Sequence, residues 1–214
     1  MKTFLSPTFT SVKICGITRG ADADLLANLG VDALGVNFWP QSRRYCDPEM
    51  AKPFLHEVAG RILRVGVFVN NSRPLGEELF RNSLIDVVQL HGDETSEDIQ
   101  HFLEQGIPVI RAVSAENLPQ HDLPKENFAL LIDTPAGKEY GGTGRTFDWS
   151  IAGTFREEHP DIPIILAGGL TPENAEEAIK QVQPVAIDVA SGAEESPGRK
   201  DSMKVRAFLD LIKL

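Results

Sequence analysis

The sequence of 214 residues is poor in cysteine and lacks any long apolar run. Cys15 and Cys46 are its only cysteines, too few for a disulfide framework, which favours a reducing compartment. The opening residues, MKTFLSP, lack the apolar segment of a secretory signal, and no stretch is apolar over the length that spans a bilayer. We therefore expect a soluble, cytoplasmic protein that does not contact membranes.

Basic residues are also scarce. The 21 Lys and Arg are outnumbered by 31 Asp and Glu, which gives a formal net charge of −10. Nucleic acids and anionic membrane surfaces are bound by basic patches, so the composition argues against both partners. The composition does not argue against a small anionic substrate, because a few arginines can make the electrostatic potential at a binding site positive. The oligomeric state is left open between monomer and homodimer.

Apolar residues make up 42% of the chain, enough for a large core, and they fall in short runs separated by helical patterns. The runs are mostly continuous, as expected for parallel strands buried on both faces. They span residues 12–15, 33–38, 63–69, 87–91, 109–113, 129–133, 162–167 and 185–189. The helical patterns span residues 21–28, 48–58, 74–82, 96–105, 149–158, 172–181 and 203–214.

Eight strand–helix units without a change in composition predict an α/β protein with a single (β/α)₈ TIM barrel over residues 12–214, after a short extension over residues 1–11. A doubly wound open sheet is the alternative, but a barrel has no edge strands to protect. Thr95 and Pro172 carry helix-start signals. The crossover over residues 114–127 has two prolines and little periodicity, so we expect its helix to be short or irregular.

In such a barrel, reactive side chains gather at the carboxyl ends of the strands. Cys15 ends the first run and Asp133 ends the sixth. A thiolate can remove a proton, and burial favours the protonated, donating form of a carboxyl group. To act as a base near neutrality, Cys15 would need its pKa lowered from about 8.5. The alternatives are a small buried cysteine and a carboxylate that caps its own loop. Polar residues also end or follow other runs, namely Asn37, Asn70, Gln89, His91, Arg111 and Asp188.

Glycine-bearing turns follow the seventh and eighth runs. Gly168 and Gly169 form one of them, and Ser191 and Gly192 form the other. Backbone N–H groups in such turns bind anions, glycine allows a phosphate to come close, and barrel phosphate sites recur in this pair of loops. We therefore predict a phosphate site there, the alternative being tight turns without a ligand.

Three further features bear on a substrate. The adjacent Arg43 and Arg44 could hold a carboxylate in a bidentate pair, although paired arginines also occur in solvated turns. The glycine-rich segment over residues 138–147 is long for a barrel crossover and is predicted to be a lid over the site. His91 has no second ligand at metal-binding spacing, so no metal site is predicted.

Several segments together resemble the phosphoribosylanthranilate isomerase family. They occur in the family's order from about residue 12 to the C-terminus. They are KICGIT (13–18), RVGVFVN (64–70), VQLHG (88–92), DT (133–134), GGTG (141–144), FDW (147–149), AGGLTPEN (167–174) and DVASG (188–192), followed by Glu194, Pro197, Gly198, Lys200 and Asp201.

This resemblance implies a cofactor-independent enzyme of tryptophan biosynthesis. Its reaction would be the Amadori rearrangement of N-(5-phosphoribosyl)anthranilate, a phosphosugar, to 1-(2-carboxyphenylamino)-1-deoxyribulose 5-phosphate. By motif, Cys15 matches the family's general base, Asp133 its general acid, and Arg44 the arginine that meets the anthranilate carboxylate. The phosphate would rest on the two glycine-bearing turns. The sequence departs from the family's usual residues at Asn37, Trp39 and Arg43, beside the presumed anthranilate site.

The alternative functions are those of other phosphosugar barrel enzymes and of a barrel that binds phosphate ligands without catalysis. A Schiff-base aldolase needs a lysine at a strand end, and no predicted strand ends in one. A metal-dependent epimerase needs several inward-facing ligands. The histidine-pathway isomerase performs the same rearrangement with paired aspartates, one of them at the position of Cys15. A degenerate barrel that only binds phosphate ligands would have lost Cys15 or Asp133, and both are present.

Overall fold

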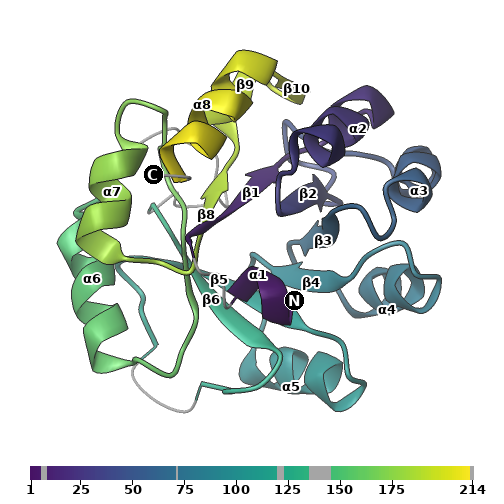
Figure 1. Cartoon of the computed structure of the whole chain (residues 1–214). Helices are drawn as coiled ribbons and strands as arrows, with labels where there is room; N and C mark the ends of the chain where they lie inside the picture. The colour runs from purple at the N-terminus through teal and green to yellow at the C-terminus, as the bar shows by residue number, and fades with distance from the viewer. Residues whose placement is uncertain (6–8, 71, 120–122, 135–145, 213–214) are drawn as a thin grey trace.

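The computed structural model describes residues 1–5, 9–70, 72–119, 123–134 and 146–212. Eight parallel strands form a closed barrel in sequential order, which confirms the predicted fold (Figure 1). These strands are β1 (Ser11–Cys15), β2 (Ala33–Asn37), β3 (Leu63–Phe68), β4 (Val87–Leu90), β5 (Val109–Ser114), β6 (Phe128–Asp133), β7 (Ile164–Leu166) and β8 (Ala186–Val189).

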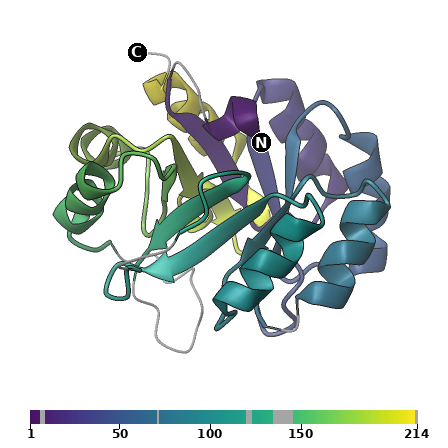
Figure 2. The ribbon, with the colours of Figure 1, turned by 90° about the horizontal axis from the view of Figure 1, so that it is seen from below.

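A ring of helices surrounds the barrel, as Figures 1 and 2 show from two directions. They are α2 (Gly20–Leu29), α3 (Pro48–Glu57), α4 (Arg73–Arg81), α5 (Ser96–Glu104), α6 (Trp149–Glu158), α7 (Ala175–Val182) and α8 (Ser202–Ile212). Between β5 and β6, the described residues 115–119 and 123–127 form turns and irregular chain but no helix. The weak helical pattern of this crossover agrees with that result.

Side chains on each strand alternate between the inside of the barrel and the layer beneath the helices. Ala33, Val65 and Leu131 belong to a small inner cluster, whereas a much larger cluster joins the strands to the helices. Phe4 of the short helix α1 (Lys2–Leu5) is only 4% exposed and belongs to the inner cluster. Figure 1 shows α1 lying across the middle of the ring, so it covers the end at which the strands begin.

Helix α7 begins three residues later than predicted. Pro172 was expected at its first position, but the helix starts at Ala175, after Asn174. The Asn174 side chain accepts a hydrogen bond from the Thr171 N–H at 2.8 Å and donates to the Gly169 carbonyl at 3.0 Å. These bonds fold the segment before α7 back on itself as a turn. The predicted start at Thr95 is confirmed by a capping box with Asp98.

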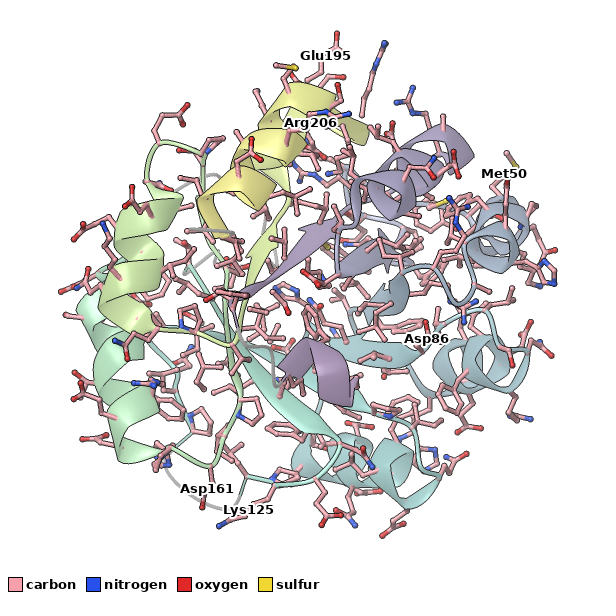
Figure 3. All side chains as sticks on the ribbon, viewed as in Figure 1. Met50, Asp86, Lys125, Asp161, Glu195 and Arg206 are labelled. Atoms are coloured by element: carbon pink, nitrogen blue, oxygen red, sulfur yellow. The ribbon has the colours of Figure 1, made fainter. Side chains whose placement is uncertain are left out.

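The outer surface is polar. Figure 3 shows Lys125, Asp161 and Glu195 at the outer margin of the molecule, where Lys125 and Asp161 form an exposed ion pair at 3.0 Å. In the part of the chain that the structure describes, no helix is long and apolar enough to cross a membrane. Unlike this exposed ion pair, Lys13 and Asp188 form an ion pair that is buried within the barrel.

Candidate active site

Cys15 and Asp133 occupy equivalent places in the barrel. Each is the last residue of its strand, on β1 and β6 respectively. Two residues earlier on the same strand faces lie the buried Lys13 and Leu131, and Leu131 belongs to the inner cluster. Since all eight strands are parallel, the thiol and the carboxyl group lie at the same end of the barrel.

Asp133 is held by groups on two neighbouring segments. Its Oδ1 atom accepts a hydrogen bond from the Thr134 N–H at 2.7 Å, and its Oδ2 atom lies 3.4 Å from Nε2 of His91. Nε2 of the Gln89 amide lies 3.1 Å from Nδ1 of His91. With the amide donating to Nδ1, the imidazole carries its proton on Nε2, facing Asp133. The Asp133 side chain is 13% exposed, so it is partly buried and still reachable.

Cys15 lies between buried charges. The Lys13 ammonium group beside it is paired with Asp188 at 2.7 Å. Burial raises the pKa of the Cys15 thiol above its usual value, and the positive charges of Lys13 and Lys200 only partly oppose this. The free site therefore does not provide the lowered pKa that Cys15 would need to act as a base near neutrality.

The structure separates the two adjacent arginines. Arg43 is exposed, whereas the Arg44 side chain is only 12% exposed and lies over Gly16, where a Cβ would overlap its Cδ. Arg44 donates to both oxygens of Glu194, from Nε at 2.8 Å and from Nη2 at 2.7 Å. This bonding raises the pKa of Arg44. Among the described residues, no acceptor bonds its Nη1 group.

Glu194 is the centre of a buried cluster that sequence reasoning missed. It begins the hairpin of β9 (Glu194–Ser196) and β10 (Arg199–Lys200). Its Oε1 atom accepts from Lys200 Nζ at 2.8 Å, and the two side chains are 4% and 0% exposed. Burial raises the pKa of Glu194, but Arg44 and Lys200 outweigh it and hold that pKa below its usual value. Two cations and one anion leave one net positive charge beside Cys15, whose carbonyl accepts from Lys200.

The two glycine-bearing turns are in contact. Gly168 and Gly169 have φ values of +90° and +62°, which favour glycine. A Cβ on Gly192, in the 3₁₀ turn η2 (Ser191–Ala193), would overlap the carbonyl oxygen of Leu170. In the described part of the chain, the N–H groups of Gly168, Gly169, Ser191 and Gly192 donate to no protein acceptor. Backbone anion sites use neighbouring N–H groups of this kind, which have no protein acceptor.

Two further candidates from the strand ends, Asn70 and Arg111, share a contact with Glu94. Arg111 pairs with the buried Glu94 at 2.8 Å, and Glu94 also accepts from the Asn70 N–H at 2.7 Å. These contacts join the loops after β3 and β4. The segment predicted as a lid, residues 138–147, lies outside the described residues except for its last two. No group of three metal-ligating side chains occurs within the ranges that the structure covers.

Eight parallel strands in sequential order, with ionisable side chains at their carboxyl ends, define an α/β-barrel enzyme. A family model described as N-(5'phosphoribosyl)anthranilate (PRA) isomerase matches residues 12–211. The chain belongs to this family, and it is an isomerase of tryptophan biosynthesis.

Individual relatives agree over nearly the whole chain. An N-(5'-phosphoribosyl)anthranilate isomerase of Syntrophus aciditrophicus is 40% identical over 210 residues, which cover 95% of this chain and 87% of the relative. The crystal structure of the Thermotoga maritima phosphoribosyl anthranilate isomerase has a TM-score of 0.82 at 38% identity, covering 95% of this chain and 98% of that one. A related isomerase structure contains reduced 1-(o-carboxyphenylamino)-1-deoxyribulose 5-phosphate; it has a TM-score of 0.78 at 34% identity, with coverage of 95% and 98%.

Proposed function

We propose that the carboxyl end of this barrel performs the family's Amadori rearrangement, with Asp133 as general acid and Cys15 as general base. The substrate is N-(5-phosphoribosyl)anthranilate and the product is 1-(2-carboxyphenylamino)-1-deoxyribulose 5-phosphate. The observation that carries this assignment is the position of the two groups at the ends of β1 and β6 within one closed barrel. The product analogue bound to a relative supports a ligand of this class.

Asp133 begins the reaction. Its carboxyl group gives a proton to the ring oxygen of the ribose, the C1–O bond breaks, and the nitrogen lone pair forms an iminium ion with C1. The His91 proton and the Thr134 N–H, which both face Asp133, stabilise the carboxylate that remains. Hydrogen bonds that strengthen as charge develops lower the barrier.

Cys15 completes the reaction. The iminium ion makes the hydrogen on C2 acidic, so a thiolate can remove it and leave an enolamine. Protonation at C1 and loss of the hydroxyl proton at O2 then give the ketone. One proton has left Asp133 and one has reached Cys15, and exchange with water restores both groups.

Two anion sites would fix the substrate between these groups. We assign the phosphate to the N–H groups of Gly168, Gly169, Ser191 and Gly192, which belong to two loops that touch each other at Gly192 and Leu170. We assign the anthranilate carboxylate to the Nη1 side of Arg44, whose opposite edge is held by Glu194. A guanidinium group fixed on one edge loses little further freedom on binding.

We infer that the functional unit is the barrel of residues 12–214, preceded by a short extension over residues 1–11, and that it works in the cytoplasm as a monomer or homodimer. The support for the compartment is the scarcity of cysteine and the biosynthetic role. The packing of Phe4 inside the barrel indicates that the extension contributes to stability.

The purified protein should consume fluorescent phosphoribosylanthranilate without added metal or nucleotide. The decay of substrate fluorescence, with chromatographic detection of the aminoketose, measures this turnover. A chelator in a parallel reaction is the control and should not slow it. Tight binding of the product analogue without any turnover would instead identify a non-catalytic phosphate binder.

Arg44→Ala should act mainly on substrate affinity. A lost hydrogen-bonded ion pair with the carboxylate corresponds to about 1.5–3 kcal/mol, or roughly a 10- to 150-fold rise in KM, with a smaller effect on kcat. Arg43→Ala is the matched control, since this neighbouring arginine is exposed and should leave both constants near the wild type. A large fall in kcat at unchanged KM would contradict the assignment of Arg44.

A further inference from the structure

A fully buried ammonium group lies against the thiol of Cys15. Lys13 stands two residues earlier on the same face of β1, is 0% exposed, and donates to Asp188 Oδ1 at 2.7 Å. A Cβ on Gly35 of β2 would lie 2.9 Å from Sγ of Cys15 and 3.0 Å from Nζ of Lys13. The thiol and the ammonium group thus fill the space that a side chain at Gly35 would need.

A lysine is almost never fully buried, because an ammonium group loses its hydration there and needs paired partners to compensate. Among the described residues, Lys125, Lys180 and Lys204 are exposed, whereas Lys13 and Lys200 are buried and need an explanation. The ammonium group of Lys13 pairs with Asp188 at 2.7 Å, and its other polar neighbour is the Cys15 thiol. An apolar pair of similar volume would fill the same space without that desolvation cost.

We propose that Lys13 is a positioning residue of this reaction, whose ammonium group stabilises the thiolate of Cys15 while Asp188 holds the ammonium group in place. This inference rests on the proposed role of Cys15 as the base. Lys13 does not exchange a proton in this scheme. Its positive charge increases the fraction of Cys15 that is present as thiolate, the form that accepts the proton.

The charges around Cys15 support this role. Four charged groups act on it: Lys13 on its own strand, Asp188 on β8, Lys200 on β10, and Arg44 in the loop after β2. Without Lys13, a thiolate would share its buried site with the Asp188 carboxylate, and two like charges at short range repel each other strongly. With Lys13 present, the ammonium group balances the negative charge of the Asp188 carboxylate before the thiolate forms.

The lysine stays charged in its buried position. Burial by itself lowers the pKa of Lys13, but Asp188 and Cys15 outweigh burial and raise it above the usual value. For Cys15 the balance is opposite, since burial raises its pKa more than the neighbouring cations lower it. The thiolate of Cys15 is therefore the less favoured form of this residue, and Lys13, which lies against it, sets how much of that thiolate exists.

A purely structural role is the competing explanation. Lys13 lies opposite Asp188 in the register of β1 and β8, the strand pair that closes the barrel between the two ends of the sequence. The ion pair could serve only to fix that closure. Stability measurements alone cannot separate the two roles, whereas titration of the thiol can.

The test is the titration of Cys15 in Lys13→Met, followed by the ultraviolet absorbance of the thiolate and by the pH dependence of alkylation with iodoacetamide. Both enzymes carry Cys46→Ser, although burial and Asp47 already raise the pKa of Cys46 to about 11. We expect the Cys15 midpoint to rise by roughly one to three pH units. The value of kcat/KM at neutral pH should fall by the same factor, roughly 10- to 1,000-fold, and the part of the pH profile that follows the Cys15 titration should move upward by the same shift.

Two further variants keep the test decisive. Lys13→Met leaves Asp188 unpaired. Lys13→Met/Asp188→Leu replaces the whole pair by apolar groups and so leaves no unpaired buried charge, the change that destabilises most. The double variant should still raise the Cys15 midpoint, because the contacting cation is lost. Arg64→Met is the matched control: Arg64 is a buried cation on β3 that pairs with Asp86 at 2.7 Å. It should cost stability without moving the Cys15 titration.

An unchanged Cys15 midpoint in the folded Lys13 variants overturns the inference and leaves Lys13 a structural residue. A raised midpoint with unchanged kcat/KM overturns the assignment of Cys15 as base, and with it the role of Lys13 in the reaction. A raised midpoint with a matching loss of kcat/KM supports both.

Discussion

Asp133→Asn should lower kcat by about 100- to 10,000-fold, the range that positioned general acids contribute, while KM changes much less. Asparagine has nearly the size of aspartate and can still accept from the Thr134 N–H, which bonds Asp133 at 2.7 Å. It cannot deliver a proton to the ring oxygen. Because that proton moves only on the way to the transition state, its loss acts on kcat more than on substrate binding.

Steady-state kinetics on the fluorescent substrate measure this effect. Asp161→Asn makes the same chemical change at an exposed ion pair with Lys125 at the outer margin of the molecule (Figure 3), and it should leave both constants near the wild type. His91→Asn removes the neighbour of Asp133 but not the acid, so its effect should be smaller. An Asp133→Asn enzyme that changes only in KM would show that Asp133 binds substrate rather than protonating it.

The positions of Cys15 and Asp133 could be predicted because they follow from regular structure. A continuous apolar run predicts a buried parallel strand, and parallel strands in sequence order carry their last residues to one end of a barrel. The placement of both residues at one end of the barrel does not depend on which side chains the loops carry. The same reasoning identified the two glycine-bearing turns, whose contact through Gly192 and Leu170 the structure adds.

The electrostatic environment could not be predicted in this way. Glu194 lies 150 residues after Arg44, and Lys200 lies 185 residues after Cys15, so neither contact leaves a local pattern. The resemblance singled out Arg44, but periodicity does not show which of Arg43 and Arg44 turns inward, since that depends on the space over Gly16. Lys13 did leave a signal, because strand alternation places it on the same face as Cys15. A lysine at an inward strand position predicts a buried partner, which the structure shows to be Asp188.

Cys15→Ala should lower kcat by about 100- to 10,000-fold, as expected for the loss of a positioned base. Cys15→Ser should be almost as inactive, because a hydroxyl group yields far less of its anion near neutrality than a thiol does. Cys46→Ser is the matched control, since Cys46 is the other cysteine, is buried, and is not among the groups assigned to the reaction. A Cys15→Ser enzyme with nearly wild-type kcat would exclude the thiolate as the base.

Deuterium at C2 of the substrate separates the two assignments from each other. If Cys15 removes the C2 hydrogen, Cys15→Ala makes this step rate-limiting, and the isotope effect on kcat should approach its intrinsic size. If Asp133 opens the ring, Asp133→Asn slows a step that breaks no bond to C2, and the isotope effect should approach one. Opposite changes from two variants at the same end of the barrel cannot arise from a shared structural disturbance, which would weaken both steps. The same isotope effect in both variants would mean that the acid and base roles are not divided between Asp133 and Cys15 in the way proposed.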